Sequence, residues 1–72
     1  MDKIRLVHDI VGSTLTMWLG DPSTEHICEE TADEVVLMKD AAGRLIGVEI
    51  LHYRPATVGA VLNVETFVTP AA

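Results

Sequence analysis

The sequence has little of what small domains commonly use to hold themselves together. Cys28 is its only cysteine, so no disulfide can form within the chain. Aromatic residues are scarce, and no apolar run approaches the ~20 residues of a membrane-spanning helix. The N-terminus also lacks the long apolar stretch of a signal peptide. Because lone thiols are usual in reducing compartments, these absences together predict a cytoplasmic protein.

Basic residues are scarce as well. Five Lys and Arg stand against 11 Asp and Glu, which gives a net charge of −6, and the basic residues are not clustered. Nucleic-acid binding needs a basic patch, so we expect no nucleic-acid partner, and we expect no membrane association. The acidity either keeps a chain that is 49% hydrophobic in solution or steers it toward a basic protein.

The length of 72 residues leaves room for one domain, which we place over residues 1–72. A domain of this size buries only about 60% of the surface that its unfolded chain exposes. The hydrophobic gain then roughly cancels the conformational entropy that is lost, so small domains usually add a disulfide, a metal or a partner chain. Since an internal disulfide is excluded, we predict a homo-oligomer, most simply a dimer.

Alternating and β-branched apolar residues predict a mainly β fold. Strand patterns run over residues 3–8, 14–19, 34–39 and 44–51, and the last two are dense enough for the centre of a sheet. Residues 21–33 are acidic and rich in turn formers, which predicts a loop, although residues 26–28 fit a short extra strand. We expect a four- or five-stranded antiparallel meander, with residues 57–68 forming a further strand or a short helix.

Glycines and aspartates predict the turns. The stretch from Asp40 to Gly43 is typical of a type I turn that closes a hairpin, with Gly43 in the left-handed conformation. Asp9 begins a second Asp-x-x-Gly stretch, and we expect its carboxylate to accept hydrogen bonds from the amides of that turn. Gly47, inside the last strand pattern, indicates a bulge or the close approach of another segment; a ligand packed over the strand is the alternative.

One segment carries a resemblance to a known family. Residues 40–51, Asp-Ala-Ala-Gly-Arg-Leu-Ile-Gly-Val-Glu-Ile-Leu, closely resemble the hallmark D-x-x-G-R-[LV]-[VI]-G-[IV]-E-[IL]-L of small prokaryotic proteins known as domain of unknown function 2283. A weaker likeness upstream rests on Asp9 and Leu15, so the resemblance spans residues 3–51. It implies a small antiparallel sheet without an established activity. Some members look like partners of toxin-like proteins, which implies an antitoxin-type role.

Carboxylates are the main candidates for chemistry. Glu49 lies among apolar neighbours, where a buried carboxylate without a partner is costly. It either points to solvent, pairs with a basic residue, or has a raised pKa and acts as a general base or ligand. The candidate basic partners are Arg5, Lys39 and Arg44. An enzyme or small-ligand site would combine Glu49 with Asp9, Asp40 or His8, but their spacing matches no catalytic motif, so enzymatic activity stays open.

The soft metal ligands do not predict a metal site. They are His8, His26, Cys28 and His52, and only the His26-x-Cys28 spacing puts two of them on one side of a strand. A nucleophilic pair of Cys28 and His26 would lack a third group to orient it. We therefore expect no metal and no other cofactor.

A protein-interaction module is the function that the sequence favours. Trp18 falls on the polar side of its strand pattern, where a tryptophan either anchors an interface or tucks under the C-terminal segment. The acidic residues between 21 and 33 would face a basic partner: Glu25, Glu29, Glu30 and Asp33. The alternatives are a small-ligand binder or enzyme centred on Glu49, and an orphan domain with a structural role only.

Overall fold

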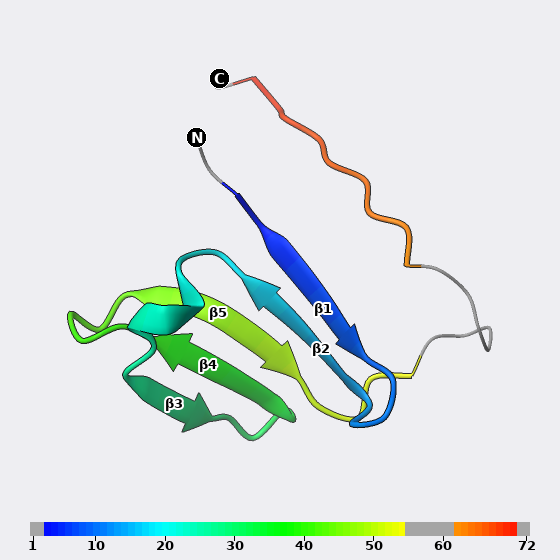
Figure 1. The fold of residues 1–72 in the computed structure, drawn as a ribbon. Coiled ribbons are helices and arrows are strands. Elements are labelled where there is room, and N and C mark those ends of the chain that lie inside the picture. Colours follow the sequence, from blue (N-terminus) through cyan, green and yellow to red (C-terminus); the bar gives the residue numbers. More distant parts are fainter. Residues whose placement is uncertain (1–2, 55–61, 71–72) are drawn as a thin grey trace.

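The computed structural model describes residues 3–54 and 62–70, and its strands form one open antiparallel sheet (Figure 1). The strands are β1 (Arg5–Asp9), β2 (Thr14–Trp18), β3 (Ile27–Glu30), β4 (Val35–Lys39) and β5 (Leu45–Ile50). A short 3-10 helix, η1 (Pro22–Thr24), lies between β2 and β3. The prediction of a mainly β fold with four or five antiparallel strands in one sheet is confirmed, and the sheet has five. No helix in the described ranges is long and apolar enough to cross a membrane.

The acidic segment holds more structure than the predicted loop. Residues 27–30 form the edge strand β3, which pairs antiparallel with β4 from Ile27 opposite Lys39 to Glu30 opposite Val36. The extra strand suggested for residues 26–28 therefore exists, shifted toward the C-terminus. Two consecutive glutamates interrupt the apolar alternation, so the strand is hard to recognise in the sequence. Charge on an edge strand also discourages it from pairing with other chains.

The order of the strands is β1-β2-β5-β4-β3, which differs from a simple sequential meander. After β2 the chain passes through η1 to the far edge of the sheet and returns through β4 and β5. The meander is thus formed by β3, β4 and β5, and β5 closes it against β2. The last strand has the densest apolar pattern. Its central position in the sheet gives it a neighbouring strand on each side, as expected for a strand of this composition.

The register of the strands gives the sheet two distinct faces, because directly opposite residues point to the same side. We call one side the mixed face. Its rows are Arg5–Trp18–Gly47–Met38–Cys28 and Val7–Thr16–Glu49–Val36–Glu30. We call the other side the apolar face. Its residues are Leu6, Met17, Val48 and Leu37 in one row, which ends on Glu29 of β3, and His8, Leu15, Ile50 and Val35 in the next.

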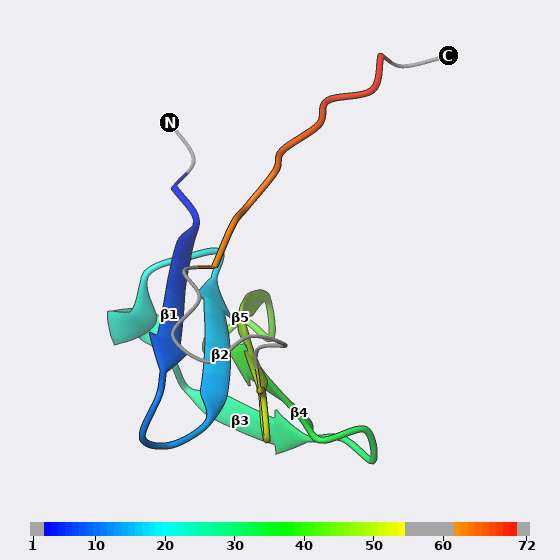
Figure 2. The same ribbon diagram turned by 90° about the vertical axis from the view of Figure 1, so that its right-hand side faces the viewer.

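Few side chains of this sheet are fully shielded from solvent. Among the described residues the buried hydrophobic ones are Met38, at 4% exposure, and Ile46, at 7%, and none falls below 2%. Figure 2 shows why: seen from the side, the five strands form a single layer. A second layer of secondary structure is what normally buries a sheet face, and none is present among the described elements.

Gly47 marks the place where β5 departs from regular pairing. Met38 is opposite Gly47 while Lys39 is opposite Leu45, so β5 carries one extra residue there. A Cβ on Gly47 would lie 2.7 Å from Cε3 of Trp18 and 2.8 Å from Cε of Met38. The structure thus shows both a bulge and a close approach at this glycine. Trp18 is half-buried against Gly47 rather than exposed.

The C-terminal segment does not join the sheet. Residues 62–70 are coil and lead away from the strands (Figure 1), with Phe67 82% and Val68 96% exposed. The strand or helix predicted for residues 57–68 is therefore absent from its described part, because no strand pairs with the backbone there. Residues 57–61 of that prediction lie outside the described residues.

The contact between Gly47 and Trp18 yields a test. Gly47→Ala is expected to lower the free energy of unfolding by about 1–3 kcal/mol, because the new methyl group would overlap the ring of Trp18 and force it to shift. In the double variant Gly47→Ala/Trp18→Ala the overlap is gone, so the loss should be smaller than the sum of the two single losses. Urea unfolding of the four proteins measures this coupling. Strictly additive losses would contradict the contact.

Candidate functional site

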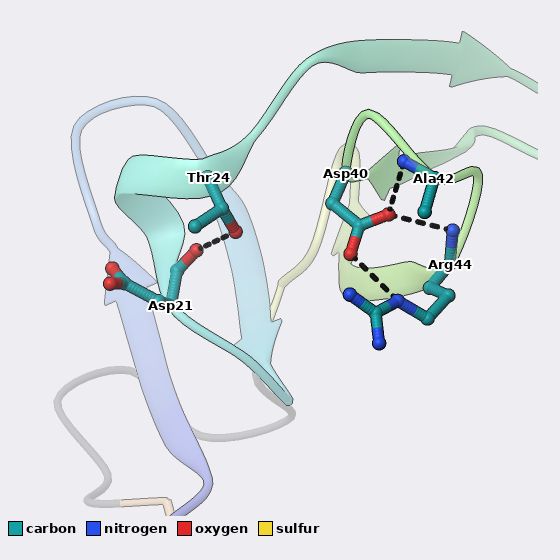
Figure 3. A network of polar contacts seen from close by, with 5 residues as sticks. All are labelled: Asp21, Thr24, Asp40, Ala42 and Arg44. Carbon is teal, nitrogen blue, oxygen red and sulfur yellow. Dashed lines mark hydrogen bonds and ion pairs between the residues drawn. The ribbon is translucent and has the colours of Figure 1, made fainter.

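The turn between β4 and β5 is built around the carboxylate of Asp40. Oδ1 of Asp40 accepts hydrogen bonds from the backbone N–H groups of Ala42 at 3.0 Å and Arg44 at 2.9 Å (Figure 3). Its Oδ2 accepts one from Nε of Arg44 at 3.0 Å. Gly43 has a φ of +81°, the left-handed conformation expected at this position. The carboxylate therefore fixes the turn that sets β5 against β4.

The same contacts determine the charge state of Asp40. The hydrogen bond from the Arg44 backbone N–H is the largest influence and lowers the pKa of the Asp40 carboxyl, helped by the charge of the guanidinium and opposed by partial burial. The group is ionised at neutral pH, and its lone pairs are occupied by the turn. A carboxylate held in this way is poorly suited to act as a general acid or base.

A shallow groove separates this turn from η1 and includes Leu19 and Ile46 in its lining. Asp21 at its rim caps η1, since Oδ1 of Asp21 accepts from the N–H of Ser23 at 2.9 Å and from its Oγ at 2.8 Å. The first of these bonds is the main reason that the pKa of Asp21 is lowered. Figure 3 shows the carboxylate of Asp40 directed into its own turn, and the hydrogen bond that Oγ1 of Thr24 donates to the backbone carbonyl of Asp21 at 2.7 Å. The groove thus gains no convergent polar groups from the two carboxylates.

Glu49 lies half-buried on the mixed face, in the row that also holds Thr16. Oγ1 of Thr16 donates to Oε2 of Glu49 at a long 3.4 Å. None of the three basic residues predicted as its partners forms an ion pair with it in the described part of the chain. Lys39 instead places its Nζ 3.0 Å from Oε2 of Glu29. Glu49 therefore has a hydroxyl neighbour but no charged group to orient it.

The four residues proposed for a small-ligand or catalytic site do not converge. Asp9 sits at the end of β1, where its Oδ1 accepts from the N–H of Gly12 at 2.9 Å, so it is part of a turn. Asp40 lies at the opposite end of the sheet, after β4. His8 is on the apolar face, its ring edge-on to Tyr53 at 5.1 Å, whereas Glu49 is on the mixed face.

Cys28 is an exposed thiol with an acidic neighbour. Its Sγ donates to Oε1 of Glu25 at 3.1 Å. This hydrogen bond is the largest of the causes that raise the pKa of the Cys28 thiol, and desolvation and the charges of Glu25 and Glu49 act in the same direction. The thiol is therefore protonated and weakly nucleophilic at neutral pH. Within the described ranges no three His, Cys, Asp or Glu side chains gather into a metal-binding group.

The four acidic residues proposed for partner binding fall into two pairs. Glu25 and Glu29 are engaged inside the molecule, the first with the thiol of Cys28 and the second with Lys39. Glu30 and Asp33 are exposed and form no ion pair in the part of the chain that the structure describes. The charge that a partner would meet is therefore concentrated at the C-terminal end of β3.

A junction at the end of β5 was not indicated by the sequence. Ser13, Glu34 and His52 all have left-handed φ values, 56°, 60° and 54°. The N–H of Leu51 donates to the carbonyl of Glu34 at 2.9 Å, and that of Tyr53 donates to the carbonyl of Ser13 at 2.8 Å. The segment after β5 thus binds the turns of two other strand pairs. Left-handed backbone is usually signalled by Gly or Asn, and neither is present here.

The apolar face is built mainly of hydrophobic side chains. Its two rows cross β1, β2, β5 and β4 without a charged residue. Exposed large hydrophobics on this side are Leu6 and Ile50, and the other residues of the two rows in these four strands are half-buried. The next row holds Ile27 and Leu45 with Lys39 between them. Apart from Tyr53 beside His8, no described element packs against it. Contiguous uncovered apolar surface of this kind is typical of an interaction site.

A comparison with family models matches residues 14–54, more than half of the chain, to the family described as "Protein of unknown function (DUF2283)". The chain belongs to this family. The match takes in β2 to β5, including the hairpin turn at Asp40, and starts after β1 and the turn at Asp9. No curated protein and no solved structure matches this DUF2283 member.

The lowered pKa of Asp40 predicts a defined dependence of stability on pH. The ionised carboxylate contributes stability that is fully present above the ordinary value of 3.8 and is lost as the pH falls through the lower value of the folded state. Asp40→Asn should lower the free energy of unfolding at pH 7 and flatten its fall between about pH 5 and pH 2. Urea unfolding at a series of pH values measures both effects.

Asp33→Asn is the matched control, because it removes an exposed carboxylate that forms no ion pair in the described residues. Its unfolding curve should follow that of the unaltered protein at every pH. If Asp40→Asn also kept the full pH dependence, the carboxylate of Asp40 would not be stabilising the hairpin turn.

Proposed function

We propose that this DUF2283 protein is a protein-interaction module and that its apolar face is the surface that binds the partner. The observation that carries the proposal is the pair of uncharged rows, which cross four strands and lie uncovered by the described elements. Burying such a face favours association by about 25 cal/mol for each Å² of apolar surface removed from water, and the loss of translational, rotational and side-chain freedom on binding offsets much of this gain. The absence of a converging carboxylate site among the described residues favours binding over catalysis.

The proposed partner is a basic protein. The chain carries a net charge of −6, and Glu30 and Asp33 lie at the C-terminal end of β3 without an ion pair in the described residues. Glu29, opposite Leu37, is the carboxylate of β3 on the apolar face itself. Attraction between such a patch and a basic surface mainly raises the association rate, whereas apolar contacts govern dissociation. The two sets of residues should therefore affect different rate constants.

An antitoxin-type role, in which the module neutralises a small basic protein, is the specific form of this proposal that the family resemblance suggests. We place the protein in the cytoplasm, because its single thiol fits a reducing compartment.

The apolar face is tested by Ile50→Thr, which keeps a β-branched residue in β5 but places a hydroxyl group on that face. Once a partner has been co-purified from native cells, this variant should dissociate from it about tenfold faster, a cost of about 1.4 kcal/mol. Val11→Thr makes the same change in the exposed turn after β1 and should leave the rate unchanged. Equal dissociation rates for the three proteins would show that the partner binds elsewhere.

The electrostatic part is tested by Glu30→Lys combined with Asp33→Lys. Reversing these charges should slow association with the partner and flatten its dependence on salt, because salt screens charges over about 8 Å at physiological strength. The matched control is Glu25→Lys with Glu65→Lys, which reverses the same number of exposed charges away from the C-terminal end of β3 and should change the association rate less. Stopped-flow kinetics from 50 to 500 mM salt, about 14 to 4 Å of screening, measures both. An acidic partner would contradict this part.

A further inference from the structure

The two edges of the sheet differ in how well they are protected. The β3 edge carries Glu29 and Glu30 in a strand of four residues, and charge on an edge discourages pairing with another chain. The β1 edge is longer, regular, and free of proline and bulges. Val7 at its centre is 43% exposed, and no described residue hydrogen-bonds to the outer side of β1. An edge of this kind is open to another strand.

The sequence of β1 is complementary to itself. It reads Arg-Leu-Val-His-Asp, a basic residue at one end, an acidic one at the other and apolar Val7 in the middle. We propose that two copies of the chain pair through β1, antiparallel and about a two-fold axis at Val7. This register places Arg5 opposite Asp9 of the second copy, and the same pair occurs again on the other side of the axis.

Three features of the monomer fit this register. Arg5 and Asp9 point to the same mixed face, as directly opposite residues must. Arg5 forms no ion pair in the described residues. Asp9 uses Oδ1 for the N–H of Gly12 and keeps its other oxygen for a second donor. A shift of the pairing by one residue would separate both ion pairs.

The register also decides how the two sheets are oriented. Pairing residue for residue about Val7 puts the axis perpendicular to the sheet, so the apolar faces of both copies lie on one side. A shift by one residue would turn one copy over. Two five-stranded sheets then join into one sheet with β3 at both ends and a continuous apolar face between.

The C-terminal segment is the other candidate for this edge. Residues 62–70 contain one charged residue, Glu65, which could form an ion pair with Arg5 but would leave Asp9 without a basic partner. In this structure they lie apart from β1 as coil (Figures 1 and 2). The second copy supplies both charges and matches all five positions of β1, so we assign the edge to it.

The first test is cross-linking in a Cys28→Ser background. Val7→Cys should react with a short bismaleimide to give a covalent dimer in high yield, because the two residues meet at the axis with their Cβ atoms about 5 Å apart. Val11→Cys is the matched control, since Val11 is 97% exposed but lies off the paired strand. Equal cross-linking of both variants, or none at Val7→Cys, would overturn the proposal.

The second test is the dimer affinity by analytical ultracentrifugation. Val7→Lys places two like charges at the axis and should weaken the dimer by at least about tenfold, whereas Val11→Lys adds the same charge without effect. Circular dichroism checks that both variants keep the sheet. A dimer that survives Val7→Lys but is lost on Phe67→Ser with Val68→Ser would assign the edge to the C-terminal segment and refute the β1 pairing. This proposal is independent of the partner site on the apolar face.

Discussion

The pairing of β2 with β5 is the contact on which the rest of the sheet depends. It joins the β1–β2 hairpin to the β3–β4–β5 meander, and without it the chain would be two small pieces. A two-stranded hairpin alone is marginally stable in water. Gly47 is the condition for this pairing, because it leaves room for the ring of Trp18 on the facing strand. The N–H groups of Leu19 and Gly20 continue the pairing to the carbonyl of Ile46 at the bulge.

The residues that mark the family resemblance are explained by this architecture. Asp40 and Gly43 form the turn that pairs β5 with β4, and Gly47 leaves space for the ring of Trp18. Glu49 completes the row of Thr16 on the mixed face. Each of these roles is structural, so the family pattern describes how the sheet is built. The pattern also specifies apolar residues at Val48 and Ile50 on the apolar face, whereas the acidic end of β3 and the edge of β1 lie outside it.

The sequence predicts this fold as far as local chemistry determines it. Alternation located four strands, and the Asp-x-x-Gly spacing located the hairpin turn, because both signals lie within a few residues. The order of the strands depends on pairing between segments more than 25 residues apart, such as Trp18 with Gly47. Alternation predicts which side chains share a face of the sheet, but it does not predict which strands are adjacent. The left-handed conformations at Ser13, Glu34 and His52 could not be predicted, because none of these residues is Gly or Asn. The carboxylates proposed as a site lie apart because the strand order, which the sequence did not predict, separates them.

A sheet of one layer leaves a physical problem that the chain has to solve. Its mixed face is partly closed by Trp18, Met38 and the buried hydroxyl of Thr16, whereas its apolar face has no such cover among the described residues. The proposed pairing through β1 would not cover that face; it would extend the face across two copies and put the acidic β3 strands at its two ends. A basic partner would then meet one apolar strip bounded by negative charge on both sides. In the proposed assembly the β1 edge would therefore enlarge the surface, and the apolar face would supply the area that the partner buries.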